Sequence, residues 1–384
     1  MSATTSAGSW DGWLAERADL RRERGVERTD PVLRDDSMID LASNDYLGLA
    51  RDTRVIGAAL AATERYGASA AASRLVTGTL PVHREVERAL VDLTEQPAAL
   101  AFSSGYAANI GVVSALTGRG AHILLDAHAH ASLHDAARMS RSPYEVFAHN
   151  DAAALERRLR ELGGVRVLVA VESIYSVLGD AAPLDELYAV CRAHDALLLV
   201  DEAHGIGVTG SGRGLVHALG LAGARDLVVT ATLSKSLGAQ GGAALGSPLL
   251  RTHLVNTARS FIFDTGLAPA AAAAAAEAAR IVAARPQLAA AVHERAAIIG
   301  DRCGISPAAG AVQSLPMPGP LDAVAAREEL RAAGILVGCF RPPSVPDGVS
   351  RLRITARADL SLQDVERAAT RVRTVAERFE RVPQ

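Results

Sequence analysis

One side chain in this sequence is chemically unlike the other cations. Of the 40 lysines and arginines in the chain, Lys235 is the only lysine, and it lies in the stretch VVTATLSKSLGAQGG (228–242). A guanidinium does not lose its proton in a protein, whereas a desolvated amine does so and then attacks carbonyl groups. Since an arginine-rich composition can leave one lysine by chance, the residues around Lys235 must decide whether it forms a Schiff base.

Other polar side chains follow apolar stretches that are typical of buried strands. In an open α/β sheet, ligands bind at the carboxyl ends of the strands. The residues in such positions are Ser103, Ser104 and Gly105 after ALAF, His128, His130 and His134 after HILLD, Asp201 and His204 in ALLLVDEAH, and Thr232, Ser234 and Lys235 after LVVTA. We therefore expect these residues to meet at one edge of a sheet.

This set of groups suits pyridoxal 5′-phosphate (PLP). The cofactor needs an amine for its aldehyde, a carboxylate that keeps its pyridine nitrogen protonated, a ring that stacks on its face and a site for its phosphate. Lys235, Asp201 and His130 supply the first three groups. Gly105 begins a predicted helix, whose free N–H groups bind anions, and Ser234 is one of the hydroxyl residues that supplement them.

The pattern of elements predicts an α/β fold. Short aliphatic runs alternate with amphipathic segments such as 151–163 and 183–195, which favours a largely parallel sheet covered by helices. The predicted strands are 99–102, 122–126, 144–148, 165–171, 196–201, 227–231 and 242–246.

The pattern changes after residue 265. A long alanine-rich helix is followed by a stretch rich in proline and glycine, a helix over 321–334, the strands ILVGCF and RLRITA, and a last helix from about 361. We predict an N-terminal helical arm (1–45), a large PLP-binding α/β domain (46–265) and a small C-terminal α+β domain (266–384).

The composition argues against several other classes of protein. The formal net charge is −3 and no block of like charges occurs, which disfavours a nucleic-acid or membrane-surface partner. Cys191, Cys303 and Cys339 are far apart and form no CxxC pattern, as expected in a reducing cytoplasm. We expect no secretory signal at the N-terminus, and the most apolar run is interrupted by charges, so we also expect no membrane span.

Two alternative interpretations concern local motifs. His130 and His134 have the i, i+4 spacing of helical zinc ligands, but no third ligand is evident, so we predict no metal site. The stretch GIGVTG (205–210) matches the GxGxxG pattern of NAD-binding oxidoreductases. It does not follow a strand directly, and no acidic residue ends a strand about 20 residues later, so a glycine-rich loop is the preferred interpretation.

The chain resembles the α-oxoamine synthases, which are PLP enzymes of the aspartate-aminotransferase fold (fold type I). The resemblance extends nearly from end to end, and its motifs are specific only in combination. They are SNDYLGL (43–49), SRLVTGT (73–79), FSSGYAAN (102–109), HAS (130–132), ESIYSVLGD (172–180), DEAHGIGVTGSGRG (201–214), TLSKSLGAQGG (232–242), FIF (261–263) and RLRIT (351–355).

The resemblance implies a role for each residue near the cofactor. Lys235 forms the Schiff base and later acts as a base, Asp201 pairs with the pyridine nitrogen, and His130 stacks on the ring. Ser176 and His204 bind the phenolic oxygen of the cofactor. The residues implied at its phosphate end are Ser104, Gly105, Tyr106, Thr232 and Ser234.

The resemblance also implies the substrates. SRLVTG and DEAHGIGV are most similar to members that condense L-alanine with a pimeloyl thioester of CoA or an acyl-carrier protein, releasing CO2 and free thiol. Glycine C-acetyltransferases are the nearest alternative. Arg353 and Asn44 are implied at the amino-acid carboxylate, Ser344 at the acyl group, and Arg28, with Arg21 as a competitor, at the distal carboxylate. The family further implies a homodimer with active sites at the subunit interface.

Overall fold

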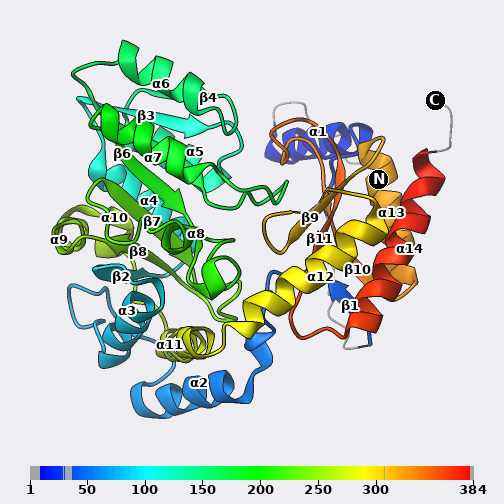
Figure 1. Cartoon of the computed structure of the whole chain (residues 1–384), viewed down its shortest axis with the longest axis horizontal. Helices are drawn as coiled ribbons and strands as arrows, with labels where there is room; N and C mark the ends of the chain where they lie inside the picture. Colours follow the sequence, from blue (N-terminus) through cyan, green and yellow to red (C-terminus); the bar gives the residue numbers. More distant parts are fainter. Residues whose placement is uncertain (1–8, 29, 31–36, 307, 381–384) are drawn as a thin grey trace.

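The computed structural model describes residues 9–28, 30, 37–306 and 308–380, and its strands form two separate sheets (Figure 1). The larger sheet has seven strands in the order β2-β8-β7-β6-β5-β3-β4. Its strands are β2 (Ala98–Phe102), β3 (Ala121–Asp126), β4 (Tyr144–Phe147), β5 (Arg166–Glu172), β6 (Leu197–Asp201), β7 (Leu227–Thr232) and β8 (Gly242–Gly246).

The larger sheet is mostly parallel. Strands β4, β3, β5, β6 and β7 run parallel in that order, and β8 is antiparallel to both β7 and β2. Alternate residues of β6 pack into opposite layers, with Leu198 and Val200 on one face and Leu199 on the other. A strand that is buried on both faces needs aliphatic residues throughout, which explains the continuous apolar runs. The predicted fold class is confirmed.

Helices cover both faces of the larger sheet. One layer includes α4, α5, α9 and α10, and the other includes α2, α3, α7 and α11. The helices of this part are α2 (Thr53–Tyr66), α3 (Pro81–Thr94), α4 (Gly105–Leu116), α5 (Ala131–Ser140), α6 (Ala152–Glu161), α7 (Leu184–Ala193), α8 (Leu215–Ala218), α9 (Pro248–Thr257), α10 (Arg259–Ile262) and α11 (Pro269–Ala284), with the short 3₁₀ helices η1 (Leu49–Arg51) and η2 (Gly210–Gly212).

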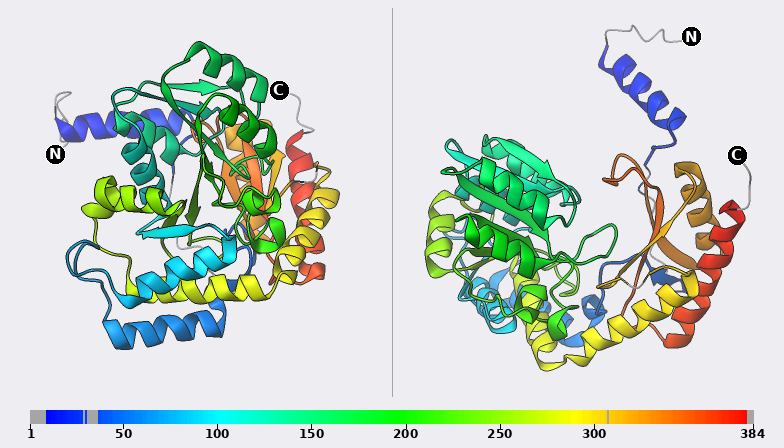
Figure 2. Two further views of the ribbon diagram at one scale, coloured as in Figure 1. Left: turned by 60° about the vertical axis from the view of Figure 1, so that its left-hand side comes forward. Right: turned by 45° about the horizontal axis from the view of Figure 1, so that its top comes forward.

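The smaller sheet joins the two ends of the chain. Its order is β1-β10-β11-β9, with β1 parallel to β10 and the other pairs antiparallel. The strands are β1 (Ile39–Leu41), β9 (Val312–Pro316), β10 (Ile335–Phe340) and β11 (Arg351–Thr355), and the helices are α12 (Gln287–Cys303), α13 (Pro320–Ala332) and α14 (Leu362–Glu380). Helix α1 (Trp10–Glu23) precedes β1, has no buried residue, and projects away from the rest of the described chain in the right-hand view of Figure 2.

Two elements adjust the predicted division into domains. Strand β1, within the predicted arm 1–45, pairs with β10 and so belongs to the smaller sheet. Helix α11, predicted in the smaller domain, packs against α2 and α3, because its alanines let it approach them closely. The chain then crosses to the smaller part along α12 (Figures 1 and 2). The boundaries at 45 and 265 themselves remain predictions.

No helix in the part of the chain that the structure describes combines the length and the apolar character that a bilayer crossing requires.

A close approach between β8 and α4 generates a stability prediction. A Cβ atom added at Gly242 would lie 2.3 Å from the carbonyl oxygen of Ser104, the residue that caps α4. Because the backbone is rigid there, we expect Gly242→Ala to lower the free energy of unfolding by about 1–3 kcal/mol, measured by urea denaturation.

In the control Gly57→Ala, on α2, the added Cβ meets no atom within 4 Å. Since alanine is the better helix former, a gain of about 0.5–1 kcal/mol is expected there. Equal effects of the two changes would contradict the steric explanation.

Candidate active site

Lys235 lies at the carboxyl edge of the larger sheet, next to a buried histidine. It follows β7 by three residues, and its Nζ lies 2.8 Å from Nε2 of His204. Nδ1 of the same imidazole lies 2.7 Å from the hydroxyl of Tyr46. When the lysine is protonated, its ammonium group donates to Nε2, and the neutral His204 then carries its own proton on Nδ1 and donates it to Tyr46. The tyrosine hydroxyl in turn donates to Oδ1 of Asn44 at 3.0 Å.

The surroundings of Lys235 weaken its hold on a proton. Burial lowers the pKa of the amine most, and Arg353 lowers it further, against the opposing charges of Asp201 and Glu172. The result is a pKa of about 8, well below the ordinary value for lysine. Burial and the neighbouring Lys235 also lower the pKa of His204, which is therefore neutral. At neutral pH the ammonium form still predominates, but far more of the amine is unprotonated than in an ordinary lysine, as a nucleophile or base requires.

Asp201 ends β6 and is 5% exposed. Its Oδ1 accepts a hydrogen bond from the N–H of Ala203 at 2.9 Å, and its Oδ2 accepts one from Nδ2 of Asn109 at 2.8 Å. The same Asn109 nitrogen donates to the hydroxyl of Ser132 at 2.8 Å. Asn109 therefore couples the carboxylate to the start of α5.

His130 is the N-cap of α5, and its orientation is set by the same network. Its Nδ1 lies 2.7 Å from the hydroxyl of Ser132, which also receives the hydrogen bond from Asn109. Burial lowers the pKa of His130, so the ring is neutral near pH 7. A neutral ring fixed through Ser132 is suited to stacking on a planar ligand.

The residues of the predicted phosphate site lie where β2 and β7 end and the antiparallel β8 begins. Ser104 caps α4, so Gly105 and Tyr106 are its first two helical residues, whose N–H groups have no acceptor within a helix. A Cβ at Gly105 would lie 3.0 Å from that of Thr232, which explains the glycine. The hydroxyls of Thr232 and Ser234 lie 2.8 Å apart. The hydroxyl of Tyr106 donates to Asp135 at 3.0 Å, and this tyrosine is half exposed.

Arg353 on β11 reaches from the smaller part into the same network. Its Nε donates to the carbonyl oxygen of Ser176 at 2.8 Å, its Nη1 to Oδ1 of Asn44 at 3.0 Å, and its Nη2 to the hydroxyl of Tyr46 at 3.3 Å. The aromatic ring of Phe340 lies 5.2 Å from the guanidinium carbon. A guanidinium has five N–H donors, so two remain for an anionic ligand.

One cavity of about 830 Å³ brings most of the predicted residues together. Residues of both parts of the chain form its wall. The predicted site residues that line it are Arg28, Asn44, His130, Ser176, His204, Lys235, Ser344 and Arg353. Asp201 and the predicted phosphate residues lie outside this lining. Arg28 donates a hydrogen bond to the hydroxyl of Ser344, whereas its competitor Arg21 lies in the last turn of α1 and does not line the cavity.

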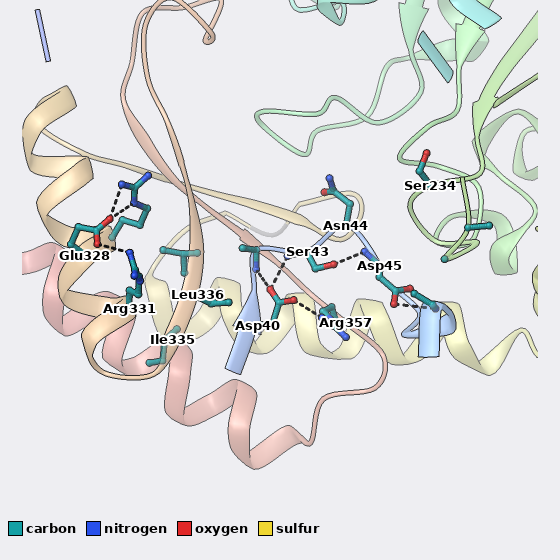
Figure 3. A pocket seen from close by; sticks show the side chains of 16 residues that line it. Asp40, Ser43, Asn44, Asp45, Ser234, Glu328, Arg331, Ile335, Leu336 and Arg357 are labelled. Atoms are coloured by element: carbon teal, nitrogen blue, oxygen red, sulfur yellow. Dashed lines mark hydrogen bonds and ion pairs between the residues drawn. The ribbon is translucent and has the colours of Figure 1, made fainter. Parts of the chain in front are cut away.

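Asn44 reaches this cavity because its segment is tied to the smaller sheet. Oδ1 of Asp40 accepts from the N–H of Ser43 at 2.9 Å, and Oδ2 accepts from Nη1 of Arg357 at 2.7 Å (Figure 3). Asn44 also borders a second cavity of about 590 Å³, to which Ser234 contributes from the larger part. The two cavities thus adjoin at Asn44.

Three residues of this network were not among the sequence predictions. Tyr46 is fully buried between His204 and Arg353, and Asn109 joins Asp201 to Ser132. Glu172 is 1% exposed, pairs in register with Asp201, and its Oε1 has no hydrogen-bond partner. Burial raises the pKa of Glu172 well above its ordinary value. The sequence offered one indication of these residues: Tyr46 lies in the motif SNDYLGL, Asn109 in FSSGYAAN and Glu172 in ESIYSVLGD.

The two alternative motifs lack the structures they need. GIGVTG leads into the short helix η2 rather than a long helix, so it does not form a dinucleotide-binding turn. Within the described ranges, no group of three or more His, Cys, Asp or Glu side chains is arranged to bind a metal ion.

The fold and this site define the class of protein. Residues 36–372 match the model of the family described as aminotransferase class I and II, and the chain belongs to this family.

Relatives with assigned names are similar over almost the whole length. The 8-amino-7-oxononanoate synthase of Mycolicibacterium smegmatis is 49% identical over 365 residues, which cover 94% of each chain. That of Mycobacterium tuberculosis is 47% identical over 386 residues, covering 98% of this chain and all of the relative. A serine palmitoyltransferase of S. paucimobilis with a bound PLP–myriocin aldimine has a TM-score of 0.89 at 29% identity, covering 98% of this chain and 100% of that chain. The predicted resemblance to the α-oxoamine synthases is confirmed.

The electrostatics of Lys235 generate a prediction that needs no substrate. Because Lys235 is the only lysine, the reaction of its amine with cyanate is measurable on one peptide by mass spectrometry. In the cofactor-free protein we expect the pH dependence of this reaction to have its midpoint near pH 8. Asp201→Asn should shift it to lower pH, because the carboxylate stabilises the ammonium form. The control Asp226→Asn, at the opposite end of β7, should not. A midpoint near the ordinary value of 10.5 would contradict the proposed environment.

Proposed function

We propose that the chain is a PLP-dependent acyltransferase that condenses L-alanine with a pimeloyl thioester of CoA or an acyl-carrier protein. The products are 8-amino-7-oxononanoate, CO2 and the free thiol. The observation that carries this proposal is the identity of 47–49% to 8-amino-7-oxononanoate synthases over nearly the whole chain. The cavity is lined by an amine of lowered pKa and by three arginines from separate segments, Arg28, Arg138 and Arg353, which is consistent with it.

The residues of the candidate active site fit the proposed cofactor. PLP, when bound, supplies an aldehyde that combines with amines and a ring that withdraws electrons from the amino acid. The family match and the PLP-containing relative support this cofactor. We assign Lys235 to the aldehyde, Asp201 to the pyridine nitrogen, His130 to the ring face, Ser176 and His204 to the phenolic oxygen, and Ser104, Gly105, Tyr106, Thr232 and Ser234 to the phosphate.

Lys235 is the proposed base at the α-carbon of L-alanine. Once freed from the aldehyde, its amine takes the α-proton onto Nζ, and a pKa of about 8 allows it to bind and release a proton near neutral pH. The contact of Nζ with the neutral His204, at 2.8 Å, orients the amine in either protonation state, because tyrosine and histidine can exchange donor and acceptor roles. His130 is the second proposed acid–base group.

Arg353 and Asn44 are the proposed ligands of the amino-acid carboxylate. The guanidinium retains two N–H donors beyond its contacts with Ser176, Asn44 and Tyr46. Its planar donor pair matches the geometry of a carboxylate. Three contacts from the protein pre-orient this group, so little conformational freedom is lost when a ligand binds.

Arg28 is the proposed ligand of the distal carboxylate of the pimeloyl chain. It lines the same cavity as Lys235, and Ser344 accepts a hydrogen bond from it. Phe340, Pro343 and other apolar residues line the cavity as well, as a methylene chain requires. We assign Ser344 to the acyl group for the same reason.

A cytoplasmic homodimer completes the proposal. Leu75, Val76 and Phe263 are between 50% and 75% exposed, and the bridge between Ser73 and Thr265 brings their segments together. Exposed apolar groups that adjoin each other favour a partner surface, here a second copy of the chain. The cysteines of the described chain are all unpaired, which is consistent with a reducing compartment.

Thiol release by the PLP-loaded protein tests the proposed reaction. Pimeloyl-CoA and acetyl-CoA are each combined with L-alanine, glycine and L-serine, and Lys235→Ala serves as the inactive control. We expect release that requires both L-alanine and the pimeloyl thioester, because the relatives that carry the proposal share that activity by name. Release with glycine and acetyl-CoA alone would replace the proposal with glycine C-acetyltransferase. If no pair of substrates releases thiol, the assignment of a pimeloyl thioester as the acyl donor is wrong.

The role of Arg28 is tested with two acyl chains of equal length. Arg28→Ala should lower kcat/KM for pimeloyl-CoA by about 10-fold to 100-fold, because a charged hydrogen bond contributes roughly 1.5–3 kcal/mol. It should change kcat/KM for heptanoyl-CoA, which lacks the distal carboxylate, by less than about 3-fold. The control Arg21→Ala should affect neither donor, since Arg21 does not line the cavity. Equal losses with both donors would remove Arg28 from the acyl site.

A further inference from the structure

A charged histidine bridge lies beside the cavity, outside the residues assigned above. Nδ1 of His149 lies 2.7 Å from Oδ1 of Asp126, and Nε2 lies 2.8 Å from Oδ2 of Asp180. Asp126 ends β3 and is fully buried, whereas Asp180 belongs to the loop that follows β5. When both ring nitrogens contact carboxylates, both must carry protons, so the geometry requires an imidazolium.

Other groups around His149 make the bridge rigid. The ring of His128 stacks on it at 3.8 Å, and the ring of Tyr175 meets it edge-on at 4.4 Å. Asn150 donates its backbone N–H to Oδ2 of Asp126 and its side-chain nitrogen to Oδ2 of Asp180, at 2.8 and 2.9 Å. The bridge is thus a double connection between β3 and the loop.

The charges that face His149 agree with the geometry. Burial alone lowers its pKa, but the hydrogen bonds and charges of Asp126 and Asp180 outweigh burial and raise the pKa to about 9. His128, which is next to it, has a pKa lowered by burial and by the charge of His149, so it stays neutral. Three further ionisable groups lie nearby. Burial and the charge of Asp126 raise the pKa of Tyr175, which is therefore neutral, and they also raise the pKa of Glu172. Asp347 acts on His128 through its negative charge.

Each of the two aspartates also contacts a segment that lines the cavity, Asp126 through its carboxylate and Asp180 through its main-chain carbonyl. Oδ1 of Asp126 also accepts from the N–H of His128 at 2.7 Å, in the segment that leads to His130. The carbonyl of Asp180 accepts from the N–H of Tyr175 at 2.9 Å, which closes the loop around Ser176.

The loop is connected to the amino-acid side of the cavity as well. The N–H of Ser176 donates to Glu172 at 3.1 Å, and its carbonyl accepts from Nε of Arg353. A shift of this loop therefore moves an acceptor that orients the arginine.

We propose that His149 is a positioning residue: its imidazolium clamps the loop 173–182 to β3, and thereby fixes the wall of the cavity at Ser176 and the orientation of Arg353. The consequence for catalysis rests on the proposed function, whereas the clamp itself is a property of the folded chain. His149 touches none of the residues assigned to the cofactor or substrates, so it acts through others.

The clamp is tested by hydrogen exchange of the loop amides in the cofactor-free protein. His149→Gln loses the charge, and Asp180→Asn, at a partly exposed position, is the milder change that should fold in any case. His217→Gln is the matched control, since His217 pairs with Glu95 at 3.2 Å outside the residues that line the cavity. We expect exchange of the amides of residues 175–180 to rise about 10-fold or more in both clamp variants, and to stay unchanged in the control and in α14.

Two further readouts separate positioning from general stability. In the PLP-loaded clamp variants, KM for L-alanine should rise about 10-fold, with a smaller change in KM for pimeloyl-CoA. The reason is that the displaced carbonyl of Ser176 is the acceptor that orients Arg353. In the wild type, the clamp's protection of the loop amides against exchange should be complete below the ordinary histidine pKa of about 6.5. This protection should disappear as the pH rises through about 9, because His149 then loses the proton that makes it an imidazolium.

The outcomes distinguish the clamp from the proposed reaction. Faster loop exchange in a protein that releases no thiol from any donor would support the clamp and overturn the reaction. Normal loop exchange in both clamp variants, or protection that is independent of pH between 6 and 10, would overturn the clamp even if the enzyme is active. Equal acceleration in the loop and in α14 would also overturn it, because the effect would then be global.

Discussion

The ε-amino group of Lys235 is buried, and the proposed function requires that it still gain and lose a proton reversibly, a constraint on which the rest of the site depends. Burial alone would push its pKa far down, and the carboxylate of Asp201 is the first of the charges that oppose this effect. His204 contributes a neutral contact that neither attracts nor repels the charge strongly. The balance leaves the pKa near 8, where an amine exchanges protons readily at physiological pH.

This balance requires residues from distant parts of the chain. Parallel strands end at a common edge, so the end of β6 and the turn after β7 bring Asp201 and Lys235 to the same edge without a long loop. The smaller sheet adds Arg353 on β11, and the pairing of β1 with β10 brings in Asn44. The site therefore exists only when both sheets are folded and packed together.

Much of this arrangement was predictable from the sequence, and the exceptions have a common physical cause. Continuous aliphatic runs identified the strands of the larger sheet to within one or two residues, because only strands buried on both faces need them. Lys235, Asp201 and His204 were found from their positions after such runs. Tyr46, Asn109 and His149 were not, since their function depends on partners 158, 92 and 23 residues away that no local pattern reveals. Strand β1 was not predicted because a strand of three residues is too short to show a periodic pattern of apolar side chains.

The position of Arg353 gives the network a further property. Its positive charge lowers the pKa of Lys235, and the same guanidinium is the proposed ligand of the substrate carboxylate. A carboxylate bound there would neutralise part of that charge, so the proton affinity of the lysine would rise as the amino acid arrives. A stronger base is then available at the moment when an α-proton has to be removed, and a weaker one when the site is empty. Arg353, Tyr46, His204 and Lys235 are also joined by a continuous series of hydrogen bonds.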